Sequence, residues 1–161
     1  MFQSLFKSTV YIKISSSTLV AKHIESGRTI EDKPIVAVKN NSKGKATVAA
    51  IGSQAEKLKN ESSITVRNSF NHPRVCIDDF EIAQVTINHF IFKVVNKRSL
   101  FKPIVILHTT RLLEGGLSQI ENRALRELGE AAGARQVFIW TGRDLNDKEL
   151  INLDFNENQN N

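Results

Sequence analysis

The segment from Ile104 to Trp140 constrains the fold of this chain more than any other. Its two ends, Ile104–His108 and Gln136–Trp140, are apolar runs of strand length. Between them, apolar residues recur at spacings of three and four, which predicts one amphipathic helix from Leu117 to Ala132. A strand, a helix and a strand with a tight exit usually form a right-handed crossover in a parallel or mixed sheet. The sequence therefore predicts an α/β fold, with this apolar stripe on one helix face: Leu117, Ile120, Ala124, Leu125, Leu128, Ala131 and Ala132.

Both ends of the predicted helix carry their own signals. Ser118 stands three residues before Glu121, which is the spacing of a capping box. Gly133 follows the last apolar residue and can supply the left-handed conformation that ends many helices. Upstream, Thr9–Ile14 and Thr18–His23 read as the two strands of a hairpin.

A more specific pattern lies within the same segment. The run IENRALRELGEAAGARQVFIW (residues 120–140) resembles V-E-R-R-A-x-R-E-x-A-x-x-A-G-A-R-x-V-x-L-I of the bacterial actin-like rod-shape proteins, the MreB family. VAAIGSQA (residues 48–55) likewise follows that family's V-A-A-V-G-x-x-A, which leads from a strand into a short helix. The positions that match in register in the longer run are Glu121, Arg123, Ala124, Arg126, Glu127, Ala132, Gly133, Ala134, Arg135 and Val137.

The resemblance covers residues 1–140 and implies the N-terminal half of the actin-like fold. That half is ribonuclease-H-like, with a mixed sheet, helices and a small inserted α+β lobe. Residues 1–30 and 90–145 would form subdomain IA, and residues 31–89 the inserted subdomain IB. Within the insert, Pro34–Val38 and Ala46–Ile51 would be strands, and Phe80–Val95 a buried helix at its end. Residues 146–161 form a polar tail that we expect to be disordered.

The family's first phosphate loop has a degenerate counterpart here. The family pattern I-D-L-G-T-x-N-T aligns with Ile12-Lys13-Ile14-Ser15-Ser16-Ser17-Thr18, with one residue missing. Lys13 replaces the aspartate that organises magnesium-bound water, so a cation stands where the hydrated metal needs an anion. Ser15 replaces the glycine that lets backbone amides approach the phosphates. Two interpretations stay open: the Ser15–Thr18 hydroxyls and Lys13 bind a phosphate, or the segment is a plain polar turn.

The family's catalytic position is also changed. Where the family continues I-E-E-P after its last matched strand, this chain has Trp140 and Thr141 in place of the two acids. A threonine cannot accept a proton from water near neutral pH, so we expect the general-base role to be lost. Asp144 and Glu149 are the nearby carboxylates, and nothing in the sequence places them. The family's second phosphate loop, D-x-G-G-G-T, is absent, and we expect a naturally short protein that carries one half of the nucleotide cleft.

Two further site classes follow from the composition. One cysteine, Cys76, lies near His72 and Asp78, but a single histidine, thiol and acid without matched partners make a poor zinc set, so we expect no metal site.

No apolar run reaches the roughly 18 to 20 residues of a membrane span. At the N-terminus, Phe2, Leu5 and Phe6 are spaced as on a helix beside Lys7. Because Gram-negative members of the resembled family touch the membrane with a short N-terminal amphipathic helix, the resemblance implies a weak membrane contact here. A frayed terminus is the alternative.

These features predict a non-enzymatic relative of the rod-shape proteins, located in the cytoplasm or at the inner face of the membrane. It would bind a full-length homologue's filament or itself, and it would need no cofactor unless the degenerate site still takes ATP and magnesium. The first alternative is a basic α/β module that binds nucleic acid, since 22 basic residues exceed 17 acidic ones. The lysines are interleaved with acids and lack an exposed aromatic repeat, which disfavours nucleic acid as the partner. An active ATPase is the alternative with the least support.

Overall fold

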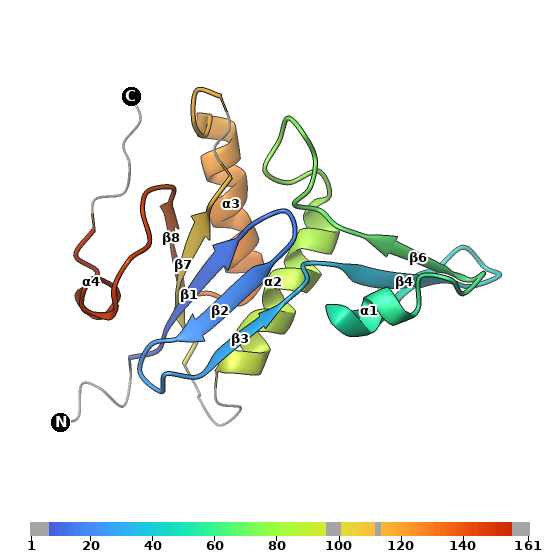
Figure 1. Cartoon of the computed structure of the whole chain (residues 1–161), viewed down its shortest axis with the longest axis horizontal. Helices are drawn as coiled ribbons and strands as arrows, with labels where there is room; N and C mark the ends of the chain where they lie inside the picture. Colours follow the sequence, from blue (N-terminus) through green and yellow to red (C-terminus); the bar gives the residue numbers. More distant parts are fainter. Residues whose placement is uncertain (1–6, 96–100, 112–113, 156–161) are drawn as a thin grey trace.

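The computed structural model describes residues 7–95, 101–111 and 114–155, which form two sheets flanked by helices (Figure 1). The larger sheet has the strand order β3-β2-β1-β7-β8 and the smaller one the order β5-β4-β6. The elements are β1 (Thr9–Ile14), β2 (Leu19–His23), β3 (Thr29–Asp32), β4 (Val36–Asn40), β5 (Ala46–Ile51), α1 (Ser53–Lys57), β6 (Ile64–Arg67), α2 (Phe80–Val94), β7 (Ile104–Thr109), α3 (Gln119–Ala131), β8 (Gln136–Trp140) and α4 (Asp147–Asn152).

The larger sheet is mixed, as predicted. β1, β7 and β8 run parallel, with Ile12 opposite Leu107 and Leu107 opposite Ile139. β1, β2 and β3 are antiparallel, and the predicted hairpin joins Ile14 to Leu19. Parallel strands are normally covered on both faces and therefore read as continuous apolar runs. All six residues of β7 are buried, which explains why this strand was readable from the sequence.

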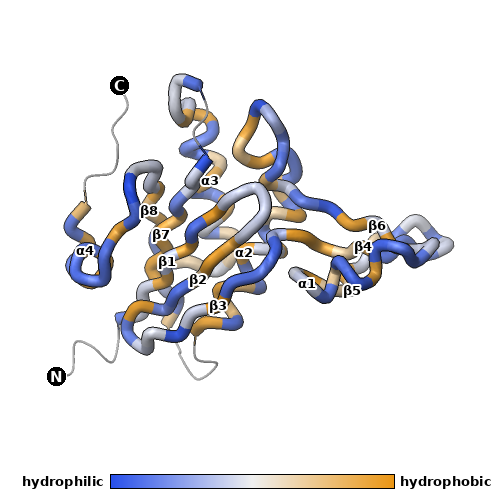
Figure 2. Tube along the Cα trace, viewed as in Figure 1, coloured by the Kyte–Doolittle hydropathy of each residue, from blue (hydrophilic) through white to orange (hydrophobic). Residues whose placement is uncertain are grey.

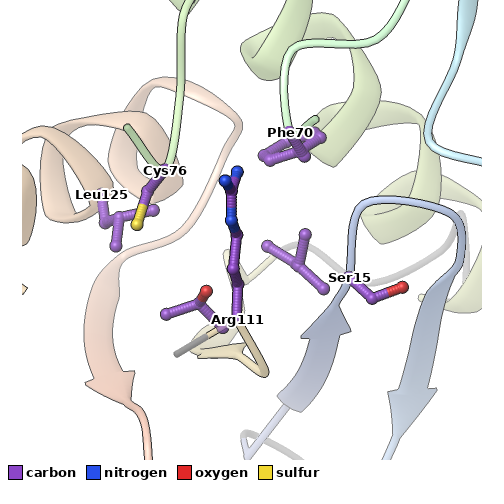
Figure 3. A pocket seen from close by; sticks show the side chains of 7 residues that line it. Ser15, Phe70, Cys76, Arg111 and Leu125 are labelled. Carbon is purple, nitrogen blue, oxygen red and sulfur yellow. The ribbon is translucent and has the colours of Figure 1, made fainter. Parts of the chain in front are cut away.

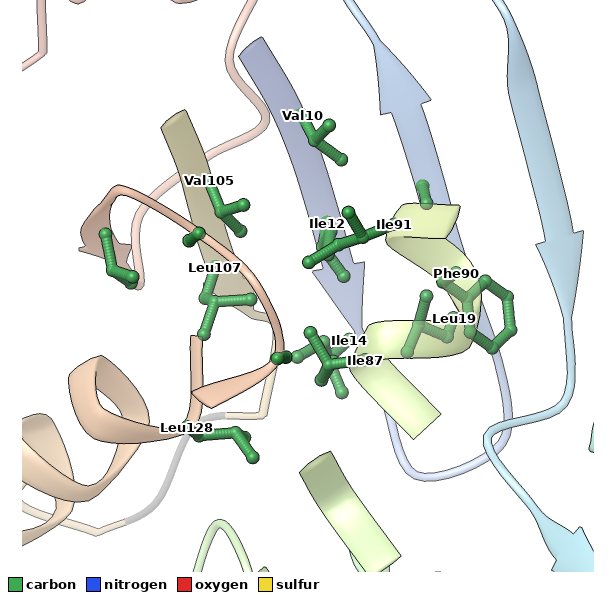
Figure 4. Close-up of a cluster of buried hydrophobic side chains, with 14 of the residues drawn as sticks. Val10, Ile12, Ile14, Leu19, Ile87, Phe90, Ile91, Val105, Leu107 and Leu128 are labelled. Carbon is green, nitrogen blue, oxygen red and sulfur yellow. The ribbon is translucent and has the colours of Figure 1, made fainter. Parts of the chain in front are cut away.

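The main core lies between the larger sheet and helices α2 and α3. Figure 4 shows Val10 and Ile12 of β1 and Leu107 of β7 facing side chains of α2 such as Ile87 and Ile91. Figure 2 shows the matching hydrophobic colour along β1, β7 and β8. Burying one such side chain contributes roughly 1.5 to 3 kcal/mol, so this cluster is the principal source of stability.

Helix α3 confirms both predicted end signals and corrects part of the predicted stripe. The Ser118 hydroxyl accepts from the Glu121 amide, while the Glu121 carboxylate accepts from the Ser118 amide at 3.0 Å. Gly133 has a φ of 113°, the conformation that favours glycine. Leu125 and Leu128 are buried, but Ile120 is 82% exposed and Ala131 is also exposed. The apolar face is narrower than the sequence pattern, because the helix packs closest along its C-terminal half, where a Cβ on Gly129 would lie 2.6 Å from Val137.

Helix α2 has the predicted bounds to within one residue, but it is not buried on every side. Phe92 is 56% exposed and Phe80 is 39% exposed. The helix lies between the two sheets, so that Ala83, Ile87 and Phe90 enter the main core. Its Ile82 instead packs with Val36 and Val38 of the small sheet. Two separate packing partners account for most of its apolar surface, while Phe80 and Phe92 stay partly exposed.

The small sheet, residues 36–67, corresponds to the predicted insertion, although the exact division into subdomains stays a prediction. β3 was not expected, and it belongs to the larger sheet even though residues 31 and 32 were assigned to the insert. β6 was also missed, because four residues with alternating partial burial give little periodicity. No helix in the described ranges is long and apolar enough to span a bilayer.

The prediction of a disordered tail is wrong for residues 146–155. Asp147–Asn152 forms α4, whose cap residue Asn146 accepts from the Glu149 amide at 3.1 Å. Leu150 is 1% exposed and packs with Tyr11, Ile106 and Leu145 on the sheet face opposite α2 and α3. A few apolar residues among polar ones are enough to hold this helix in place, because the sheet provides an apolar surface against which they pack. Residues 156–161 lie outside the described residues.

Candidate functional site

The candidate site lies where the parallel strands end. Ser15 follows β1, Thr110 follows β7 and Thr141 follows β8, and the carboxyl ends of parallel strands share one edge. The Thr110 amide and hydroxyl each donate to the Ile14 carbonyl at 3.0 Å, which fixes β1 and the β7 exit together. The degenerate phosphate loop and the Thr141 position therefore lie at the same edge of the sheet, with the end of β7 between them.

The loop from Ser15 to Thr18 is held together by hydrogen bonds among its own residues. The Ser15 hydroxyl accepts from the Thr18 amide at 2.9 Å and from the Ser17 amide at 3.3 Å. The Ser15 amide donates to the Thr18 carbonyl at 2.9 Å, and Asn68 holds the Ser16 carbonyl at 2.7 Å. A glycine at this position would leave these backbone amides available to bind an anion. Here the serine side chain occupies them.

Lys13 is charge-compensated. Its ammonium group lies 2.7 Å from the carboxylate of Asp144, which follows β8. The hydrogen bond from Lys13 holds the pKa of the Asp144 carboxyl below its usual value. The charge of Lys13 is therefore neutralised by a neighbouring segment of the chain. The negative charge of the Asp144 carboxylate would also repel an incoming phosphate.

The second nearby carboxylate is also in an ion pair. Arg143 binds Glu149 with both terminal nitrogens, and this contact lowers the pKa of Glu149 to about 2. Asp144 and Glu149 are thus both held ionised and paired. A general base for a water nucleophile works best with a pKa near the working pH, so neither carboxylate suits the role that Thr141 cannot fill.

A buried histidine, missed by the sequence analysis, lies beneath the Lys13 ion pair. His108 is opposite Lys13 in the sheet register and is 1% exposed. Its Nε2 lies 2.9 Å from the Gly142 carbonyl and its Nδ1 2.5 Å from the Tyr11 hydroxyl. Since a carbonyl only accepts, Nε2 carries the proton and Nδ1 accepts from Tyr11. Burial lowers the pKa of His108 and raises that of Tyr11 to about 12, so both groups are neutral.

The space beside β1 and β7 is nearly filled. Figure 3 shows the Arg111 side chain extending between Phe70 and Cys76. Its guanidinium donates to the His72 carbonyl. The remaining cavity measures roughly 10 Å³, about the space of one water molecule. Burial raises the pKa of the Cys76 thiol to about 11, so this thiol is unreactive at neutral pH.

The other predicted site residues divide into two groups. Within the described residues, no group of three or more His, Cys, Asp and Glu side chains could hold a metal ion. Phe2, Leu5 and Phe6, the predicted membrane contact, lie outside the described residues. Phe101, which sequence reasoning did not single out, is 48% exposed two residues before Pro103, at the edge where β1 and β7 begin.

Comparison with known proteins gives a consistent result. The family model for MreB/Mbl protein matches residues 8–143. Cell shape-determining protein MreB of Escherichia coli K12 is 26% identical over 142 residues, as is that of Salmonella typhimurium. The match covers 86% of this chain and 39% of those relatives.

Solved structures agree on the fold. MreB5 of Spiroplasma citri bound to ADP superimposes with a TM-score of 0.66 at 20% identity, over 85% of this chain and 39% of that one. A non-polymerising mutant of MamK bound to AMPPNP gives a TM-score of 0.67 at 11% identity, over 84% of this chain and 41% of that one. At these identities the likeness establishes an actin-like fold. Together with the family model, which spans most of the residues, it shows that the chain belongs to the MreB/Mbl family of cell-shape proteins.

Proposed function

We propose that this chain is a non-catalytic member of its family that acts by binding, with a full-length MreB-type filament protein or a second copy as its partner. The observation that carries this proposal is the Lys13–Asp144 ion pair at 2.7 Å. It occupies the position where the resemblance requires an anion for hydrated magnesium. The self-bound Ser15 loop and the paired Glu149 support the same conclusion.

Surface features support a role in contact. Ile120 is 82% exposed in the first turn of α3, and it is the most exposed of the large apolar side chains in the described ranges. A contact that covers it would remove apolar surface from water. We place the protein in the cytoplasm, with a weak membrane contact through Phe2, Leu5 and Phe6.

Magnesium-ATP should show no saturable binding to the purified chain at millimolar concentration, because the loop amides and Lys13 already have partners. Isothermal titration calorimetry measures this directly. If binding is seen instead, Lys13→Ala should be compared with Lys22→Ala. Lys22 makes a similar ion pair with Asp147, at 2.8 Å, but in the next strand. Stoichiometric binding that only Lys13→Ala removes would establish a phosphate site and contradict the proposal.

Co-sedimentation with the full-length relative from the same cell tests the binding role. We expect the chain to pellet with filaments, or to shorten them, and Ile120→Asp to lower the pelleted fraction several-fold. Gln119→Asp is the matched control, since it adds the same charge to the same exposed first turn, where an acid is tolerated. No association at micromolar concentration would exclude the filament partner and leave a salt-dependent nucleic-acid shift as the next measurement.

A further inference from the structure

Residues 33–67, which contain the small sheet and α1, carry the whole net charge of the chain, and we call this segment the basic lobe. It holds seven of the 22 basic residues but only two of the 17 acidic ones, Glu56 and Glu61, so its formal charge of +5 equals that of the full chain. The rest of the chain has as many acids as bases. Figure 1 shows the small sheet projecting away from the larger one, so the fold concentrates the excess charge on one projecting part of the molecule.

Five lysines of the basic lobe are exposed and form no ion pair within the described residues. One of the two acids of the lobe, Glu56, is already paired with Lys33 at 2.5 Å. By contrast, Lys13 and Lys22 of the larger sheet are each paired with an aspartate. Uncompensated charges of one sign produce a field that attracts an anionic partner. The five unpaired lysines are Lys39, Lys43, Lys45, Lys57 and Lys59.

The turn between β4 and β5 is ordered by its own hydrogen bonds. The Asn41 side-chain oxygen accepts from the backbone amides of Lys43 and Lys45, at 3.1 and 2.8 Å. Gly44 has a φ of 74°, which a glycine adopts without strain. Because β6 begins opposite Lys39, the turn extends past the three-stranded part of the sheet as a two-stranded hairpin. Figure 1 shows this basic tip at one end of the longest axis of the molecule.

We propose that the basic tip binds the phosphate backbone of double-stranded DNA without reading its sequence. A DNA duplex carries one negative charge per roughly 1.7 Å of its axis, and a lysine ammonium binds phosphate as a point charge. The major groove of B-form DNA admits a two-stranded β-ribbon, whereas that of an RNA duplex is deep and narrow. Residues 33–67 include no aromatic residue, so the stacking surface that single strands require is missing from the basic lobe.

Two other anionic partners fit the tip less well. Residues 40–45 include no large apolar side chain that could enter a membrane. The tip also lies far from the start of β1, where the proposed N-terminal membrane contact joins the sheet, so one flat membrane would not reach both (Figure 1). A second copy of this chain offers little in return, because the carboxylates that follow β8 are already paired with bases of their own chain: Asp144, Asp147 and Glu149.

Fluorescence anisotropy with a labelled duplex of about 20 base pairs and arbitrary sequence tests the proposal. We expect a dissociation constant on the order of 10 μM at about 50 mM salt, and a slope of about −4 for log K against log salt, from five phosphate contacts. Lys43→Gln combined with Lys45→Gln should weaken binding about tenfold and make the slope less negative by about 2. Lys102→Gln combined with Lys148→Gln is the matched control. It removes the same charge from exposed lysines outside the basic lobe and should change the affinity less than about twofold.

Circular dichroism establishes that both double variants are folded. Equal weakening by the two double variants would show attraction by net charge alone and overturn the inference. An absence of binding at about 100 μM protein and 50 mM salt would also overturn it, as would equal or tighter binding to a single strand or an RNA duplex of the same length. Vesicles with anionic lipids form a separate arm. Vesicle binding that the Lys43 and Lys45 changes remove, without DNA binding, would assign the tip to a membrane instead.

This inference goes beyond the proposed filament role, and its test uses no full-length relative. DNA binding can therefore fail while co-sedimentation succeeds, or the reverse.

Discussion

Replacing Leu150 with alanine is expected to lower the free energy of unfolding by about 2 to 5 kcal/mol, the usual cost of truncating a fully buried leucine. Leu150 is 1% exposed and packs against Tyr11 and Ile106 of the central strands. It therefore anchors α4 to the sheet face that α2 and α3 do not cover. The loss would include both the transfer of the side chain and the cavity left behind.

Urea unfolding followed by far-ultraviolet circular dichroism measures this effect. Ile151→Ala is the matched control, because Ile151 is the next residue of the same helix and is 46% exposed. We expect that variant to lose less than about 1 kcal/mol, since much of the side chain already contacts water. Equal losses for the two variants would mean that α4 does not hold its position on the sheet in solution.

Replacing His108 with alanine is expected to cost about 2 to 4 kcal/mol, because it leaves the buried Tyr11 hydroxyl and the partly buried Gly142 carbonyl without their partner. Tyr11→Phe removes only one hydrogen bond and should cost less, about 1 to 2 kcal/mol. The double variant measures the coupling. Losses that simply add would show that the two side chains do not interact, contrary to the 2.5 Å contact.

The same histidine predicts a pH dependence. Burial lowers the folded-state pKa of His108 below 6.5, so below that pH the unfolded chain binds the proton more readily than the folded chain. The full stability is therefore present above pH 6.5 and is lost as the pH falls toward the folded-state pKa. His23 and His89 shift in the same direction, so His108→Gln should reduce the loss between pH 7 and pH 5 without abolishing it. An unchanged pH profile for this variant would contradict a buried, neutral His108.

The candidate site was predictable in its location but not in its chemistry. Residue types at Lys13, Ser15 and Thr141 were enough to question nucleotide hydrolysis, since a lysine cannot replace a metal-organising carboxylate. Which group neutralises Lys13 was not readable, because Asp144 is far away in the sequence and reaches it only through the parallel pairing of β1, β7 and β8. His108 gave one signal, a polar residue directly after the apolar run Ile104–Leu107, and its role became visible only with Tyr11 and Gly142 beside it.

The sequence by itself determined the elements with strong local patterns: the apolar strands β7 and β8, the capped helix α3 and the β1–β2 hairpin. These follow from periodicity and capping, which act between residues close in the chain. Tertiary structure alone decided which side chains meet and which stay exposed. Ile120 continues the apolar stripe of α3 yet lies in water, while Leu150, in a stretch that reads as disordered, is almost completely buried. Burial depends on the surface that the rest of the fold presents, and no local pattern encodes that surface.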